Sequence, residues 1–500
     1  MKKKFLLLWA CGLLCSAAMA QSRPNIIVFL VDDMGWQDTS VPFWDQLTAL
    51  NKRYRTPNME RLAREGMKFT NAYATPVCTP SRVSMITGMN AAHHGVTNWT
   101  SPQKDKSSDA PDSALLPAPW KYNGFSPVKD IPNTVYATPL PALLHAAGYY
   151  TIHAGKAHWG AIGTPGANPY NMGFQVNIAG HAAGHPQSYL SEENYGNLPG
   201  KSTPQAVPDM EEYYGSGTFL TAALTREALK ALNDPVSRHQ PFYLYLAHYA
   251  VHVPLQADKD YVHHYTNLEE PEARYASMIE GMDKSLGDVM DYLREKKIDK
   301  NTIILFMSDN GGLSLAPPRG GRPHTQNLPL RAGKGSVYEG GIREPMMVKW
   351  PGVVQAGTST SQYIIIEDFF PTILEMAGIR QYHTSQTIDG RSFVKVLQHP
   401  ATQDTTRSLV WHFPNKWIAE DGPGINYKSA IRQGRWKLIY NQRDGSAELY
   451  DLQSDIGEEH NLAATFPAKT HALLQQLSSQ LQRWQAPMPV PRAKGFTQDF

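Results

Sequence analysis

The sequence predicts an α/β fold built on a large, mostly parallel sheet flanked by helices. Four short, largely apolar runs have the length of strands and lie at residues 26–31, 149–153, 242–246 and 303–307. Such runs, without polar alternation, are typical of parallel strands that are covered on both faces. After Pro271, apolar residues recur at helical spacing, at positions 275, 278, 279, 282, 286, 289, 290 and 293. Strands that alternate with helices favour a parallel sheet between helical layers.

Length and composition describe a globular protein of more than one small domain. The chain has 500 residues, of which 18% are charged and 41% are hydrophobic. The net charge is +2, and no basic run occurs beyond the first few residues, so we expect no nucleic-acid partner. After the N-terminal segment, no apolar stretch is long enough to predict a membrane span.

Residues 1–20 have the pattern of a signal peptide. Three lysines precede an apolar stretch at residues 5–14, and small residues at 18–20 surround a cleavage point before Gln21. The sequence therefore predicts an exported protein, periplasmic or secreted. A lipoprotein is the weaker alternative, because Leu14 is too large to precede a lipidated Cys15 and the apolar region before Cys11 is very short.

The C-terminal part reads as a smaller domain. Residues 435–440 and 447–452 have strand character on either side of Asp444-Gly445, which predicts a hairpin. A last helix carries a stripe of large apolar residues at 473, 474, 477, 481 and 484. We place the large domain at residues 21–395 and the smaller one at residues 396–500.

Polar side chains follow each of the four predicted strands. Two carboxylates, Asp32 and Asp33, end the first, and a carboxylate and an amide, Asp309 and Asn310, end the strand at 303–307. Lysine or histidine side chains follow the other two, at positions 156, 158, 248 and 252. Ligands of open parallel sheets bind beyond the carboxyl ends of the strands, so these residues predict one polar site.

The chemistry of these residues points to an anionic ester. Carboxylate and amide oxygens suit calcium or magnesium better than zinc. Lys156, Lys334 and Arg82 supply fixed positive charge, and His158 and His252 can transfer protons near neutral pH. A cation and the lysines would bind the ester oxygens, and the histidines would donate and accept protons.

Cys78 is the one cysteine left after the signal peptide, and it has no partner for a disulfide. A buried inert thiol is one interpretation, but its neighbours Thr79 to Arg82 are not core residues. Thr79 is a predicted helix cap, with Pro80 at the first helical position and the helix ending near Gly88. Cys78 would then lie just ahead of a helix N-terminus, which favours an anion.

These segments resemble the type I, formylglycine-dependent sulfatases. Residues 78–88, CTPSRVSMITG, match the signature C-x-P-S-R-x-x-x-x-T-G. Five further blocks fit the family in order along the chain: PNIIVFLVDDMG at 24–35, AGKAHWG at 154–160, HYAVHVP at 248–254, SDNGG at 308–312, and the block at 330–352. The resemblance implies an alkaline-phosphatase-like catalytic domain and a C-terminal domain with a small antiparallel sheet and a helix.

The resemblance implies a chemical role for Cys78. In the family, a formylglycine-generating enzyme oxidises this cysteine to formylglycine during export, and the hydrated aldehyde provides the nucleophile. It attacks the sulfur atom, the alcohol leaves, and the second hydroxyl lets the sulfated residue collapse to the aldehyde. A serine could not take this last step because it has no second hydroxyl.

The resemblance also implies the roles of the surrounding residues. Asp32, Asp33, Asp309, Asn310 and residue 78 would hold the cation, with calcium favoured over magnesium. The lysines Lys156 and Lys334 would contact the sulfate, and Arg82 would steady the hydrate. By the same resemblance, His252, helped by Lys334, would protonate the departing alcohol, and His158 would take the proton of the second hydroxyl.

The substrate is less well defined by the sequence. Loops at 101–127 and 177–218, with a cluster at 319–324, carry aromatic and hydrogen-bonding side chains that suit a sugar, although ordinary surface loops fit equally well. We predict His181, Arg322 and His324 as substrate-binding residues of an exo-acting carbohydrate sulfatase, and we expect a galactose-type sugar. Three alternatives stay open: an arylsulfatase for small aryl sulfates, a phosphonate or phosphodiester hydrolase of the same superfamily, and an inactive glycan-binding relative.

Overall fold

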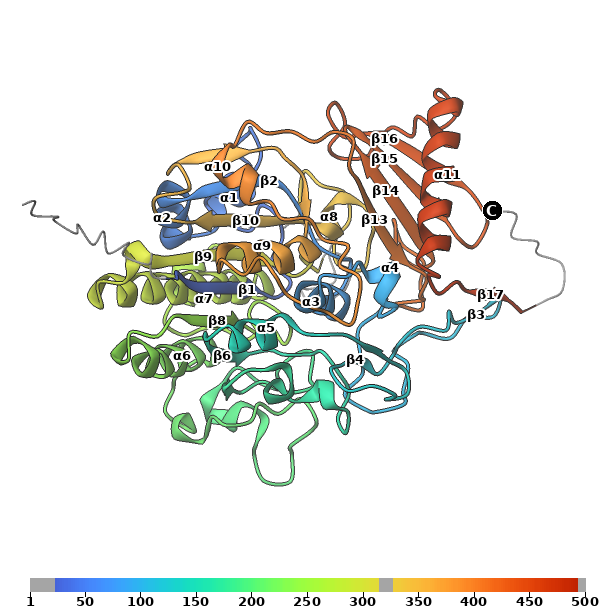
Figure 1. The fold of residues 1–500 in the computed structure, drawn as a ribbon. Coiled ribbons are helices and arrows are strands. Elements are labelled where there is room, and N and C mark those ends of the chain that lie inside the picture. Colours follow the sequence, from blue (N-terminus) through green and yellow to red (C-terminus); the bar gives the residue numbers. More distant parts are fainter. Residues whose placement is uncertain (1–22, 314–326, 493–500) are drawn as a thin grey trace, which may run out of the picture.

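A large mixed sheet forms the centre of the molecule (Figure 1). The computed structural model describes residues 23–313 and 327–492, so the predicted signal peptide lies outside the described residues. The strand order is β11-β2-β10-β9-β1-β8-β6-β7, with β12 paired to β2. These strands span Asn25–Val31 (β1), Met67–Tyr73 (β2), Tyr150–Gly155 (β6), Val176–Ile178 (β7), Phe242–Ala247 (β8), Thr302–Ser308 (β9), Arg343–Lys349 (β10), Thr358–Thr360 (β11) and Ile364–Ile365 (β12).

The four predicted strands are confirmed and lie together as β9-β1-β8-β6, all parallel. In register, Ile26 of β1 pairs with Tyr243 of β8 and with Ile303 of β9. Strand β10 is antiparallel to both of its neighbours, which makes the sheet mostly rather than wholly parallel. Because parallel strands end at one edge, the residues that follow these four strands are brought side by side.

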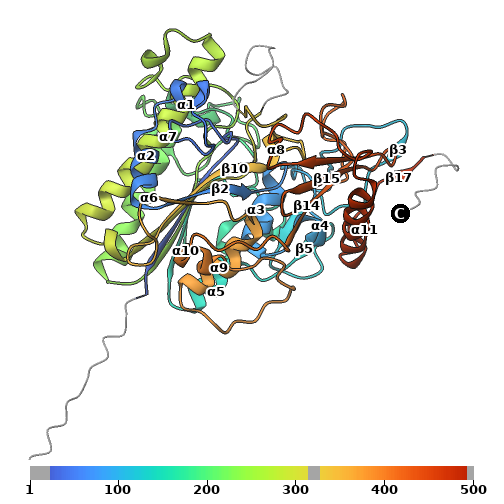
Figure 2. The same ribbon diagram turned by 90° about the horizontal axis from the view of Figure 1, so that it is seen from above.

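Helices cover both faces of this sheet, as Figure 2 shows from above. One face packs against α1 (Ala49–Arg53), α2 (Pro57–Glu65), α6 (Leu220–Ser237) and α7 (Glu270–Glu295), and the other against α3 (Cys78–Thr87), α5 (Leu140–Ala146), α9 (Phe369–Met376) and α10 (Val394–Gln398). Alternate residues of β1 serve the two layers: Ile27 and Phe29 join the first core, and Ile26 and Val28 join the second. All seven residues of β1 are buried, which explains its uninterrupted apolar sequence.

The C-terminal sheet is antiparallel and lies beside the large one, with α11 (Pro467–Arg483) on its outer face (Figure 1). Its strands are β13 (Ser408–Phe413), β14 (Lys428–Gln433), β15 (Trp436–Asn441) and β16 (Ala447–Asp451). The predicted hairpin is confirmed as β15 and β16, with Gly445 in the left-handed region at φ 74°. The predicted stripe of the last helix is confirmed in its buried members Leu473, Leu477 and Leu481. The division at residues 395 and 396 stays a prediction.

Helix α3 begins two residues earlier than the cap at Thr79 predicted. Val77 is the N-cap, Cys78 is the first helical residue, and Gly88 ends the helix with a φ of 71°. Thr79 does not cap the helix because its hydroxyl accepts a hydrogen bond from the Thr100 backbone N–H at 3.0 Å and faces the His158 ring. Cys78 therefore lies within the first turn instead of ahead of it.

The remaining elements are short. They are α4 (Ala91–His94), α8 (Glu339–Ile342), the paired strands β3 (Leu115–Leu116) and β17 (Val490–Pro491), the paired strands β4 (Gly124–Ser126) and β5 (Thr134–Tyr136), and several 3₁₀ turns. Within residues 23–313 and 327–492, none of the helices has the length and apolar character needed to cross a membrane.

Candidate active site

The residues predicted from the strand ends meet at the carboxyl edge of the parallel strands. They arrive from β1 (Asp32, Asp33), α3 (Cys78, Arg82), the segment after β6 (Lys156, His158), the turn after β8 (His252), the end of β9 (Asp309, Asn310) and the segment before α8 (Lys334). Each of them except His252 is at most 5% exposed. Their burial together makes chance proximity of ordinary surface charges an inadequate explanation.

Three carboxylates of the centre are each paired with a cation. Lys156 Nζ lies 2.6 Å from Asp32 Oδ2, and Lys334 Nζ lies 2.6 Å from Asp33 Oδ1. Arg82 donates from Nε to Asp309 at 2.8 Å. Removing one partner of such a buried pair leaves the other as an uncompensated charge, so the two partners of each pair depend on each other.

Burial and neighbouring charges separate the two aspartates at the end of β1. Burial raises the pKa of Asp32 well above its usual value, and the charge of Asp309 adds to this effect. Burial would also raise the pKa of Asp33, but the charges of His252 and Lys334 outweigh it and hold that pKa below its usual value. A cation close to Asp32 would favour its ionised form.

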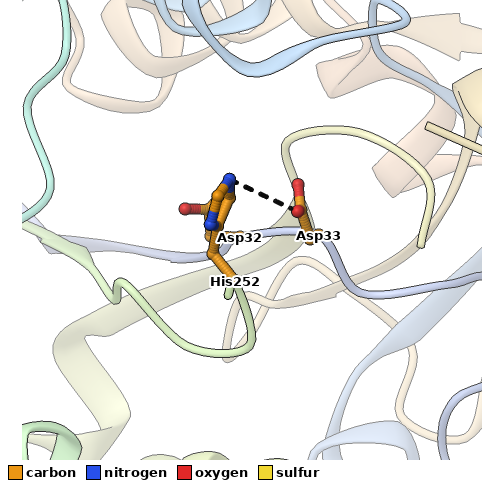
Figure 3. Close-up of side chains that lie close together, drawn as sticks. All are labelled: Asp32, Asp33 and His252. Carbon is orange, nitrogen blue, oxygen red and sulfur yellow. Dashed lines mark ion pairs between the residues drawn. The ribbon is translucent and has the colours of Figure 1, made fainter. Parts of the chain in front are cut away.

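Two buried oxygen atoms of the centre have no hydrogen-bond donor among the described residues, although Arg82 Nη2 lies 4.0 Å from one of them, Asp32 Oδ1. Asp32 Oδ1 and Asn310 Oδ1 accept no hydrogen bond from any of the described residues. Ligand atoms of Asp32, Asp33 and His252 lie within 4.8 Å of one another, and Figure 3 shows the His252 ring turned toward Asp33, with Nε2 3.5 Å from Oδ2. Three carboxylates and an amide are a set of oxygen donors that suits a hard divalent cation. The two oxygen atoms that accept no hydrogen bond are consistent with binding such a cation.

Cys78 lies beside the proton-transfer residue predicted for it. Its Sγ atom is 3.5 Å from His158 Nδ1. His158 Nε2 is 2.8 Å from the Thr100 carbonyl, which fixes Nε2 as the donor and leaves the Nδ1 lone pair facing Sγ. Burial raises the pKa of the Cys78 thiol, so the unmodified side chain is a neutral, weak nucleophile in this setting.

The centre opens into a cavity of about 870 Å³. Its floor includes Cys78, His158, His252 and Lys334. Its walls come from residues 99–109, 184–185, 203–205 and 313, and from Trp417 and Ile418 beyond β13. The cavity is large enough for a sugar residue with its sulfate group.

Trp417 also supports the segment that carries Lys334. Gly335, the next residue, has a φ of 85°, and a Cβ atom at this position would lie 2.0 Å from Trp417 Cε3. The Gly335 N–H donates to the Pro76 carbonyl at 2.7 Å, close to the start of α3. A tryptophan from the segment between β13 and β14 therefore fits directly against the backbone beside Lys334.

The predicted substrate-binding residues are only partly brought to the cavity. His181 does not line it, because its ring is held 3.0 Å from the Tyr249 hydroxyl behind the wall. His185, four residues later, lines it instead and stacks on His252 at 5.5 Å between ring centroids. Arg322 and His324 lie outside the described residues. Two further residues of the cavity wall, Trp99 and Trp417, were not predicted, because no local motif indicates them.

Fold and site together define a hydrolase for tetrahedral anionic esters, and comparison with known proteins narrows this class. The family model "Sulfatase" matches residues 24–379, and the model "N-sulphoglucosamine sulphohydrolase, C-terminal" matches residues 333–487. The chain belongs to the sulfatase family, whose fold is alkaline-phosphatase-like, and it is a sulfuric ester hydrolase.

Three relatives show how far the similarity extends. A sulfatase of Formosa agariphila is 30% identical, and the alignment covers 96% of this chain and 94% of the relative. The N-acetylgalactosamine-6-sulfatase of Mus musculus is 32% identical over 78% of this chain and 69% of its own. The solved structure of Ps i-CgsB in complex with k-i-k-neocarrahexaose superposes with a TM-score of 0.69 at 26% identity, covering 92% of this chain and 93% of that chain.

Proposed function

We propose that the protein is an exported, exo-acting carbohydrate sulfatase that uses residue 78, converted to formylglycine, as its nucleophile. One observation carries this proposal: the lone cysteine of residues 23–500 lines the cavity together with Lys334, with its Sγ atom 3.5 Å from His158 Nδ1. A thiol with a raised pKa is poorly suited to attack an ester, whereas an aldehyde hydrate at the same position provides two hydroxyl groups.

His158 is proposed as the base of the second half-reaction. Its Nδ1 atom faces residue 78, and its Nε2–H is fixed on the Thr100 carbonyl. Burial and the charge of Lys156 lower the pKa of His158, so the ring is neutral and ready to accept a proton at Nδ1.

Binding of the sulfate and departure of the alcohol fall to residues on the cavity side. Lys334 lines the cavity, and its charge, with that of the buried Lys156, favours the anionic sulfate. His252 presents Nε2 to the same space and is proposed to protonate the leaving alcohol, with Lys334 assisting.

Asp32, Asp33, Asp309, Asn310 and residue 78 are the proposed ligands of a divalent cation, with calcium favoured over magnesium. When bound, such a cation supplies Lewis-acid polarisation of sulfate oxygens and of the hydrate. The His252 ring also lies close to these ligand atoms, and its proposed role is that of the proton donor.

A sugar sulfate is the proposed substrate, and a galactose-type sugar is the preferred candidate. Two relatives support it by name, the N-acetylgalactosamine-6-sulfatase and the protein solved with neocarrahexaose. The cavity walls combine two tryptophans, Trp99 and Trp417, with hydrogen-bonding groups such as Gln103, Asp109 and Gln205. This combination binds the apolar face and the hydroxyl groups of a sugar ring.

The test combines chemistry and specificity. The mature protein is produced with a formylglycine-generating enzyme, and mass spectrometry of the peptide containing residue 78 should show an aldehyde in place of the thiol. A panel of defined sulfated galactose, N-acetylgalactosamine and glucosamine sugars is then assayed for free sulfate. Full activity of protein with an unmodified thiol would contradict the nucleophile, and no release from any sugar would contradict the substrate class.

Adding a small aryl sulfate, a phosphonate and a phosphodiester to this panel discriminates the alternatives. Faster turnover of a small aryl sulfate than of every sugar would identify an arylsulfatase. A higher kcat/KM for a phosphonate or phosphodiester would identify the other hydrolase class. The complete set of predicted catalytic side chains in one centre weighs against an inactive glycan-binding relative.

A further inference from the structure

A second large cleft lies away from the catalytic centre, between the large sheet and the C-terminal sheet. Its volume is about 940 Å³, and none of its lining residues lines the catalytic cavity. It is bounded by residues 42–46, by positions of β2, and by segments at 359–363, 403–405, 432–435 and 452–456. Strand β2 lies near the end of the large sheet that is beside the C-terminal sheet (Figure 1).

The charged residues that line this cleft are mostly basic. They comprise four basic side chains, Lys68, Arg343, Arg432 and Arg435, and one acidic side chain, Asp45. Arg343 is paired with Glu339 at 3.3 Å, and Arg435 is paired with Asp451. No carboxylate of the described residues lies within ion-pair distance of Lys68 or Arg432.

Lys68 is held in place without a counter-ion. Its Nζ donates to the Pro42 carbonyl at 2.7 Å, and the side chain is half-buried on β2. Partial burial lowers the pKa of Lys68, because the ammonium has lost water and gained no negative partner. An anion in the cleft would compensate this loss.

Arg432 is the second basic side chain of the cleft without a carboxylate of the described residues at ion-pair distance, although its Nη1 donates to the Tyr73 hydroxyl and its charge helps to lower the pKa of Glu339. Its guanidinium lies over the rings of Tyr73 and Tyr363, at 5.2 and 4.8 Å from their centroids, and Nε donates to the Gly434 carbonyl at 3.1 Å. An arginine fixed between aromatic rings loses little conformational entropy when it binds a ligand.

The rest of the lining suits a carbohydrate chain. Hydrogen-bonding side chains come from Thr70, Asn71, Ser359, Ser361 and Gln403, and apolar surface comes from residues 43, 44, 452 and 456. Hydrogen-bonding groups and apolar surface in one cleft with Lys68 and Arg432 match sugar rings that carry sulfate groups. A protein that binds a membrane surface would need a flat or protruding basic face, whereas the basic residues here line a cleft.

We propose that this cleft is a second, non-catalytic binding site for a sulfated oligosaccharide segment. The proposal rests on the proposed function only for the class of ligand. The position of the cleft is independent of the active site. A polymer held here would present its ends to the catalytic cavity at raised local concentration. The effect should fall on KM for polymeric substrate and not on turnover of a sulfated monosaccharide.

The test is affinity electrophoresis of the mature protein in gels that contain chondroitin sulfate or κ-carrageenan, beside gels with the chemically desulfated chains. The variant Lys68→Gln removes the charge but keeps a donor for the Pro42 carbonyl. The matched control is Lys297→Gln, an exposed lysine after α7. We expect the sulfated gels to retard the parent and the control alike, and Lys68→Gln to bind about fivefold to tenfold more weakly.

Lys68→Glu should abolish the retardation if the charge is what the chain recognises. Equal retardation of the parent and both Lys68 variants, retardation by desulfated chains, or no retardation by either sulfated chain would overturn the proposal. Retardation that depends on Lys68, in a protein that releases sulfate from no sugar, would sustain the cleft and contradict the proposed catalytic function instead.

Discussion

The catalytic centre and the second cleft both gather basic side chains, but they hold them differently. In the centre, Arg82, Lys156 and Lys334 each lie within 2.8 Å of a carboxylate. In the cleft, Lys68 and Arg432 have no carboxylate partner among the described residues. The paired charges of the centre are held by their carboxylates, whereas Lys68 is held, within the described part of the chain, only by a backbone carbonyl and is proposed to bind an anion. The presence or absence of a carboxylate partner for each cation therefore distinguishes the catalytic centre from the proposed binding cleft.

The largest expected effect comes from Cys78→Ser, produced where the converting enzyme is absent. Turnover should fall by about 10³-fold or more, because a serine sulfate ester has no second hydroxyl to release the sulfate. The measurement is free sulfate from the preferred sugar, with thermal unfolding as a control for folding. Turnover of Cys78→Ser at the parent rate would contradict the role of residue 78.

Arg82→Met tests the paired side of the comparison through stability. The substitution leaves Asp309 buried and unpaired, so the free energy of unfolding should drop by about 3–5 kcal/mol. Lys68→Gln, which breaks no ion pair, should cost less than about 1 kcal/mol. Urea denaturation of both variants measures the difference. Similar losses in the two variants would remove the distinction between centre and cleft.

Gly335→Ala should lower kcat/KM by about 10- to 100-fold, because the new Cβ collides with Trp417 and displaces the segment of Lys334. The matched control is Gly352→Ala. Gly352 also has a positive φ, 78°, but an added Cβ meets nothing within 4 Å. Steady-state assays of the two variants separate the collision from backbone strain, which both share. Equal activities would show that the contact with Trp417 is unimportant.

The smallest effect is expected for His185→Ala. The ring stacks on His252 at the cavity wall, and loss of an aromatic contact of this kind should reduce kcat/KM about 2- to 10-fold. His181→Ala, four residues away and outside the cavity, provides the comparison. A larger loss from His181→Ala than from His185→Ala would reverse the assignment of the substrate wall.

Local pattern predicted much of the fold and of the centre. The four inner strands, helix α7 and the last hairpin follow from runs of apolar residues and turn residues, and Asp32, Asp309 and their neighbours follow from the strand ends. The antiparallel direction of β10, the placing of Trp417 and the second cleft depend on contacts between distant segments. The early start of α3 escaped prediction because Thr79 bonds to Thr100 in place of its own helix.

The fit of Trp417 against Gly335 also bears on how the enzyme is made. Residues close to position 417 are synthesised long after every other described side chain of the reaction centre. A chain interrupted before that point would contain all the carboxylate, histidine, lysine and arginine side chains of the centre. It would lack the tryptophan that packs beside Lys334. Incomplete chains should therefore not hydrolyse sulfate esters. We expect hydrolysis only when the C-terminal part of the chain has folded against the segment of Lys334.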